Sequence, residues 1–147
     1  MTLYVIGGSH KEKQLAYNAA SFAWKELFPR INSCYIEIHL KKMNGYQGTC
    51  DQVDAREYEI EIDKKQKYDD FVTCIFHEMV HVKQYIRKEL YPECVFWKTR
   101  EEYLNLPWEI EAYKKQEVLL KKWKLQTPKK NGIITKVMKL SKLAEAC

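Results

Sequence analysis

The residues best suited to chemistry are His77, Glu78 and His81, which form the pattern HExxH. The apolar residues around them recur every three or four positions and predict a helix over 68–90. On a helix, side chains four residues apart lie on the same face, one turn apart, so both imidazoles can bind one metal ion with the Glu78 carboxylate beside them. We interpret the pattern as a hydrolytic zinc site with Glu78 as the catalytic base, rather than as two surface histidines on an ordinary helix.

A zinc hydrolase needs a third protein ligand and keeps a fourth position open for water. The two other histidines, His10 and His39, precede the motif in a predicted helix start and a predicted strand. The longer pattern HExxHxxGxxH of the metzincins is excluded, because Arg87 stands where its third histidine would be.

Two acidic residues downstream, Glu109 and Glu111, open a second predicted helix that begins at Pro107. Glu109 shares a helix face with Ala112 and the apolar stripe, whereas Glu111 shares a face with lysines. We therefore predict that Glu109 faces inward and completes the ligand set with His77 and His81. The small side chain of Ala112 would let the two helices approach closely.

Other residues near the motif have structural or chemical interpretations. Cys74 lies one turn before His77 and is predicted to be a small core residue. Trp97 and Trp108 are predicted to pack around the site. Three tyrosines could each donate a hydrogen bond to a developing oxyanion or simply pack: Tyr91, Tyr103 and Tyr113.

The combination of His77-Glu78-x-x-His81 with a later Glu109-x-x-Ala112 resembles the gluzincin group of zinc metallopeptidases. The runs HEMVHVKQY and PWEIEAY are also similar to short metallopeptidase-like proteins that bacteriophages often encode. The resemblance covers about residues 56–117 and implies hydrolysis of peptide bonds in a peptide or protein substrate, with Zn²⁺ as the cofactor. Many gluzincins carry an aspartate after the small residue of the second motif, where it supports a ligand histidine; this chain has Tyr113 there.

The resemblance further implies an α+β, minimal zincin-like fold. In that fold, a strand over 56–63 would be the edge strand before the active-site helix, and an extended substrate would pair with it. The sequence pattern agrees that 56–63 is a strand, because polar and apolar residues alternate there as they do over 33–41. The Asn44-Gly45 turn signal leads into a short strand between these two, so we expect a small, mostly antiparallel sheet.

The remaining elements follow from capping and breaking residues. Ser9 and Glu12 have capping-box spacing and predict a helix that runs to Pro29. Pro92 should end the helix over 68–90, the stretch 90–106 should be a connecting loop, and the helix from Pro107 should stop before Pro128. We expect one metallopeptidase domain over 1–127 and a basic tail over 128–147.

Composition limits the class of protein. The 147 residues are 46% hydrophobic, with five Gly and four Pro, which predicts one globular domain. Five scattered cysteines without a CxxC pair favour free thiols in a reducing compartment. The N-terminus lacks the basic region of a signal peptide, and no apolar run reaches the ~20 residues that span a bilayer, so we expect a cytoplasmic protein without membrane contact.

The charge is concentrated near the C-terminus, where Val118 to Cys147 holds eight lysines and one acidic residue. This favours weak contact with nucleic acid and leaves two alternatives to the peptidase. One is a zinc-containing module that binds DNA or a nucleoprotein through the tail. The other resembles the SprT-like proteases of DNA-bound proteins, although those close their site with a later histidine and none follows His81. Glu78 favours an enzyme, because a purely structural zinc site has no use for a carboxylate beside its ligands.

Overall fold

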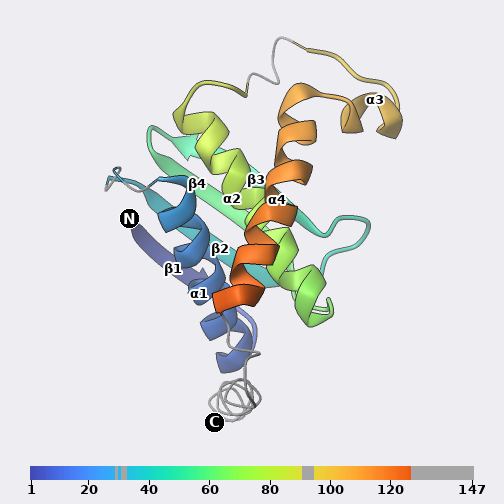
Figure 1. The fold of residues 1–147 in the computed structure, drawn as a ribbon. Coiled ribbons are helices and arrows are strands. Elements are labelled where there is room, and N and C mark those ends of the chain that lie inside the picture. The colour runs from blue at the N-terminus through green and yellow to red at the C-terminus, as the bar shows by residue number, and fades with distance from the viewer. Residues whose placement is uncertain (29, 31–32, 91–94, 127–147) are drawn as a thin grey trace.

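The computed structural model describes residues 1–28, 30, 33–90 and 95–126. Its elements in chain order are β1 (Thr2–Ile6), α1 (His10–Leu27), β2 (Tyr35–Lys41), β3 (Gly48–Asp54), β4 (Glu57–Asp63), α2 (Tyr68–Ile86), α3 (Arg100–Leu104) and α4 (Pro107–Gln126). Figure 1 shows a four-stranded sheet with helices α1 and α2 packed against it and α4 lying along α2. The predicted α+β class is confirmed, and the predicted tail over 128–147 lies outside the described residues.

The sheet buries one face. Alternate residues of the two central strands are buried, and the residues between them are partly exposed. The buried residues are Ile36, Ile38 and Leu40 in β2, and Tyr58, Ile60 and Ile62 in β4. The helices cover the buried face. Helix α1 contributes four alanines with no exposed surface, and because these side chains are small the helix can pack closely in the core.

The strand order is β1-β2-β4-β3. Strands β1 and β2 run parallel, β2 and β4 run parallel, and only β3 and β4 are antiparallel, so the expectation of a mostly antiparallel sheet is wrong. The reason is the connections: helix α1 crosses over between β1 and β2, which permits parallel pairing. Strand β3 then passes to the far side of β4 and joins it through a tight turn, in which Arg56 adopts a positive φ of 59°.

The strand predicted over 56–63 is not an edge strand. It is β4, which pairs with β2 on one side and β3 on the other, so its backbone is not open to a substrate. The edge strand next to it is β3, and β1, which the sequence analysis did not predict, is the other edge. Alternation could not reveal this, because a central strand and an edge strand of a one-sided sheet show the same pattern.

The helix boundaries follow local signals with two corrections. The capping box at Ser9 and Glu12 is formed, and α4 begins at Pro107. Helix α2 ends at Ile86, earlier than predicted, because Lys88 takes a left-handed φ of 57°. The predicted loop over 90–106 contains the short helix α3.

Helix α2 has a strongly apolar face, and its buried residues include Phe71, Ile75, Phe76 and Met79. This face packs against the sheet, so the polar residues of the helix face α4. None of the helices that the structure describes combines the length and apolar character needed to cross a lipid bilayer.

Alanine substitutions at two glycines, Gly7 and Gly45, should destabilise the fold to different extents. Gly7 and Gly45 both have positive φ, at 84° and 88°, but a Cβ at Gly7 would overlap the carbonyl of Leu40, whereas a Cβ at Gly45 would meet nothing within 4 Å. Gly45→Ala should cost about 1–2 kcal/mol of unfolding free energy from backbone strain alone. Gly7→Ala should cost roughly 1–3 kcal/mol more, because the overlap forces the strand to move. Urea unfolding of both variants measures this, and equal losses would contradict the packing argument.

Candidate metal centre

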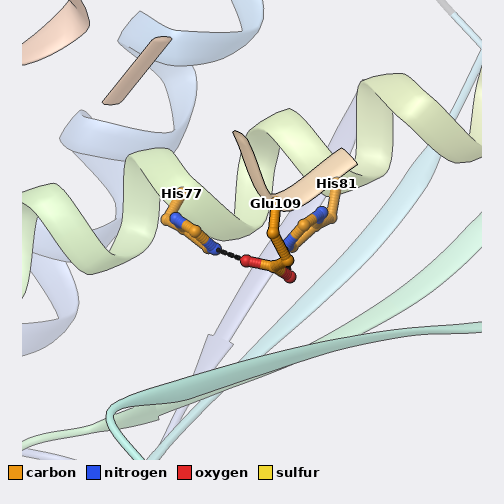
Figure 2. Close-up of side chains that lie close together, drawn as sticks. All are labelled: His77, His81 and Glu109. Carbon is orange, nitrogen blue, oxygen red and sulfur yellow. Dashed lines mark hydrogen bonds and ion pairs between the residues drawn. The ribbon is translucent and has the colours of Figure 1, made fainter. Parts of the chain in front are cut away.

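Helix α2 presents His77 and His81 side by side. Their ring centroids lie 4.8 Å apart with the planes at 82°, one turn apart on the face toward α4. The side chain of His77 is 12% exposed and that of His81 is 8% exposed, so the pair has limited access to solvent. Figure 2 shows both rings directed toward the same point.

Glu109, from the first turn of α4, occupies that point (Figure 2). One of its carboxylate oxygens lies 3.0 Å from Nε2 of His77, and the other lies 3.0 Å from Nε2 of His81. The side chain is 2% exposed, which confirms the prediction that Glu109 faces inward. Ala112, the next residue on the same face, has no exposed surface and leaves room for the close approach of the helices.

These three residues fit a tetrahedral metal ion. Their candidate ligand atoms all lie within 4.8 Å of one another, and zinc bonds of about 2.0–2.1 Å would place such atoms about 3.3 Å apart. Two imidazole nitrogens and one carboxylate oxygen are a ligand set that zinc accepts. In the part of the chain that the structure describes, no other group of three histidine, cysteine or acidic side chains has this convergence.

The surroundings of the cluster stabilise a negative charge on Glu109 and a positive charge on His81. Burial opposes charge on Glu109, but hydrogen bonds from His77 and His81 outweigh it and hold the pKa of Glu109 well below its ordinary value. Burial likewise works against a charged His81, but its hydrogen bond to Glu109 and the negative charges of Glu78 and Glu109 together outweigh burial and raise the pKa of His81. Positive charge at the nitrogens is thus stabilised by the carboxylate, and a bound cation would supply that charge instead of protons.

Glu78 stands beside the cluster without joining it. It is 5% exposed, and among the described residues its carboxylate forms no hydrogen bond or ion pair. Burial raises its pKa, and repulsion from Glu109 and Asp51 adds to this, against the opposing attraction of His81 and His77. A buried carboxylate whose oxygens are not engaged by hydrogen bonds or ion pairs can exchange a proton with a molecule bound next to it.

Two of the predicted tyrosines reach the cluster, and Tyr91 lies outside the described residues. The hydroxyl of Tyr103 donates to Glu109 at 2.7 Å. The ring of Tyr113 lies 4.7 Å from that of His77 at 63°, so an aromatic ring packs edge-on against this histidine. Neither tyrosine was predicted to have a definite role, and the structure gives Tyr103 a direct contact with a candidate ligand.

The other predicted neighbours lie where packing accounts for them. Cys74 is a buried core residue, and burial raises the pKa of its thiol well above the ordinary value. Trp108 is 5% exposed and packs beneath the site, while Trp97 lies 5.4 Å from the ring of Tyr103 and is 40% exposed. His39 bonds to Glu37 on the open face of the sheet, away from the cluster.

Sequence reasoning missed three residues at the site. Gln84 and Gln116 accept from the outer ring nitrogens of His81 and His77, and Gly48 borders Glu78. A Cβ at Gly48 would lie 2.7 Å from Sγ of Cys74 and 3.1 Å from a carboxylate oxygen of Glu78. Helix spacing already placed Gln84 on the face of His81 and Gln116 on the face of Glu109, whereas the position of Gly48 depends on tertiary contacts.

Comparison with known proteins gave no relative: no family model, no curated protein and no solved structure matches the chain.

The convergence of His77, His81 and Glu109 predicts that Glu109, and not Glu111, is the acidic metal ligand. Purified protein should carry about one zinc per chain, and Glu109→Ala should lose it on dialysis because a carboxylate oxygen is removed from the cluster. Glu111→Ala is the comparison variant and should keep more zinc than Glu109→Ala does, since Glu111 lies on the same helix but 3.0 Å from Lys83 rather than at the histidines. Metal analysis by mass spectrometry decides; retention by Glu109→Ala and loss by Glu111→Ala would show that the other carboxylate is the ligand.

Gly48→Ala should disturb Glu78 together with its neighbour Cys74. The added methyl group would press on the Cys74 sulfur and on the Glu78 carboxylate, and not on the candidate ligands, so we expect zinc content to stay near one per chain while any hydrolytic activity falls by on the order of 10-fold or more, as displacement of a catalytic group does. Gly45→Ala, whose Cβ meets nothing, is the control. If both variants keep full activity, the Gly48 contact does not position Glu78.

Proposed function

We propose that this protein is a zinc-dependent metallopeptidase of the gluzincin type, with His77, His81 and Glu109 as metal ligands and Glu78 as general base. Two features together carry the proposal. One is a converging cluster of two histidines and a carboxylate, and the other is the buried carboxylate of Glu78 beside it, which forms no hydrogen bond or ion pair with the residues that the structure describes. A structural zinc site has use for the first feature only.

The chemistry divides between the metal and this chain's residues. Zn²⁺ held by the three ligands would supply a Lewis acid that polarises water and a peptide carbonyl. Glu78 would accept the proton of the attacking water and pass it to the leaving amine. Its raised pKa suits this double role, because a group that takes up a proton must also release it. Tyr103 would keep the Glu109 carboxylate oriented through its 2.7 Å hydrogen bond.

Strand β3 is the element best placed to bind an extended substrate. It is the edge of the sheet on the side of β4, so one row of its backbone groups is not paired within the sheet. Its first residue, Gly48, borders Glu78. A peptide that paired with β3 would therefore pass next to the general base, and its main chain could bind without regard to side-chain identity. This role replaces the one expected for the strand over 56–63.

The nucleic-acid alternative gains little from the described lysines. Of the residues beyond Val118 that the structure describes, Lys122 pairs with Glu26 at 3.0 Å and Lys124 with Asp69 at 2.7 Å. Their charges serve contacts between α4 and other elements of the fold. The lysines beyond residue 126, on which the binding-module hypothesis depends, lie outside the described residues.

Glu78→Gln provides the sharpest test of the enzyme. The amide keeps the shape of the side chain but cannot accept the proton of water, so hydrolysis should fall by on the order of 100-fold or more while zinc content and unfolding midpoint stay near wild type. The substrate is a mixed library of quenched fluorescent peptides, with and without a zinc chelator. Glu57→Gln, on the open face of the sheet, is the matched control. Undiminished cleavage by Glu78→Gln would remove Glu78 from the mechanism, and a library left intact by wild-type protein with full zinc would overturn the peptidase.

A further inference from the structure

Gln84 is a buried amide whose orientation its neighbours determine. It has no exposed surface, so its polar atoms need partners within the protein. Its Nε2 donates to the carbonyl oxygen of Trp108 at 2.8 Å and to a carboxylate oxygen of Glu111 at 2.8 Å. Both partners can only accept hydrogen bonds, because one is a backbone carbonyl and the other is a carboxylate paired with Lys83. The amide oxygen of Gln84 must then face His81, and it lies 2.7 Å from Nδ1.

This orientation determines the tautomer of His81. An amide oxygen only accepts, so Nδ1 of His81 must carry the hydrogen. In the neutral ring, the lone pair then belongs to Nε2, which is the nitrogen 3.0 Å from Glu109. Gln116 makes the equivalent contact on the other histidine, with its amide oxygen 2.8 Å from Nδ1 of His77. In the metal-free protein Nε2 of each ring donates a hydrogen bond to Glu109. A metal ion that replaces these two hydrogens would bind Nε2 of both rings, and both are aimed at the same point.

We propose that Gln84 and Gln116 are positioning residues that hold His81 and His77 in the Nδ1–H tautomer for metal binding. The inference rests on the proposed function, since it assigns a role toward the metal of that site. Supporting groups of this kind are commonly carboxylates, which also make the histidine a stronger donor. Two neutral amides orient the rings without adding negative charge, so Glu109 is the one anionic ligand and the metal keeps more of its positive charge.

The amide of Gln84 is fixed by more and shorter hydrogen bonds than the amide of Gln116. Glu111, which orients Gln84, is itself bound by the buried Lys83 at 3.0 Å, and Lys83 reaches Glu89 at 3.3 Å. Gln116 is only half-buried, and its amide nitrogen has a long 3.4 Å contact with the exposed Glu117. Water can replace the Gln116 oxygen more easily than the Gln84 oxygen. Gln84 therefore has the larger effect on metal affinity.

The test measures zinc affinity by competition with a chromophoric chelator. Gln84→Met keeps the volume of the side chain but removes its acceptor, and should weaken zinc binding on the order of 10- to 100-fold. Gln116→Met should weaken it by less. Gln14→Met, at an exposed glutamine on α1, is the control and should bind as wild type does. Wild-type affinity in Gln84→Met, or a larger loss in Gln116→Met than in Gln84→Met, would overturn the proposal.

A second measurement needs no variant. Long-range ¹H–¹⁵N spectra of the wild-type histidine rings should show Nδ1–H and metal-bound Nε2 for both histidines with zinc, and the Nδ1–H tautomer in metal-free protein at alkaline pH. Protonation at Nε2, or metal on Nδ1, would refute the role of the glutamines even if Gln84→Met fails to fold.

The two proposals fail in different ways. Zinc binding with the expected tautomers but no peptide cleavage refutes the peptidase and supports the positioning role. If the protein takes up no zinc, the proposed function is wrong, and the tautomers of the metal-free rings decide the inference.

Discussion

The hydrogen bonds of Glu109 to His77 and His81 are the interaction on which the rest of the site depends. A carboxylate with 2% exposure is costly to bury unless positive or donating groups surround it, and removing one partner of such an arrangement typically costs about 3–5 kcal/mol. Three donors face this carboxylate: the two imidazoles and the hydroxyl of Tyr103. The packing of α4 on α2 is therefore also the assembly of the site, since neither helix alone satisfies its polar residues.

The sheet supports this helix pair through α2, which packs against the edge strand β3. Because the apolar face of α2 lies in the core, its polar residues are directed toward α4 and toward β3. Gly48 lets the edge strand come close to Glu78 without a side chain between them. The mixed sheet matters for this reason: its connections put β3, and not the strand directly before α2, at the open edge. A purely antiparallel order with β4 at the edge would have left a different strand unpaired on one side.

A second layer of polar residues gives the centre its rigidity. Gln84 links the outer nitrogen of His81 to the backbone of Trp108 and to Glu111, so one amide connects α2 to α4 next to the histidine pair. Burial makes each of these bonds costly to leave unmade, which limits how far the ring can turn. The packing of Tyr113 against His77 restricts the other ring sterically, where a carboxylate would have done so electrostatically.

The sequence by itself determined the features that depend on local periodicity. The spacing of His77 and His81 placed both rings on one helix face, the apolar stripe turned Glu109 inward and Glu111 away, and Ser9, Glu12 and Pro107 marked helix starts. Tertiary structure alone decided the strand directions, the strand at the edge, and the contacts of Gln116 and Gly48 with the site. The physical reason is that helix geometry repeats within four residues, whereas strand order and contacts between elements depend on how the connections cross and which surfaces pack, which no local spacing records.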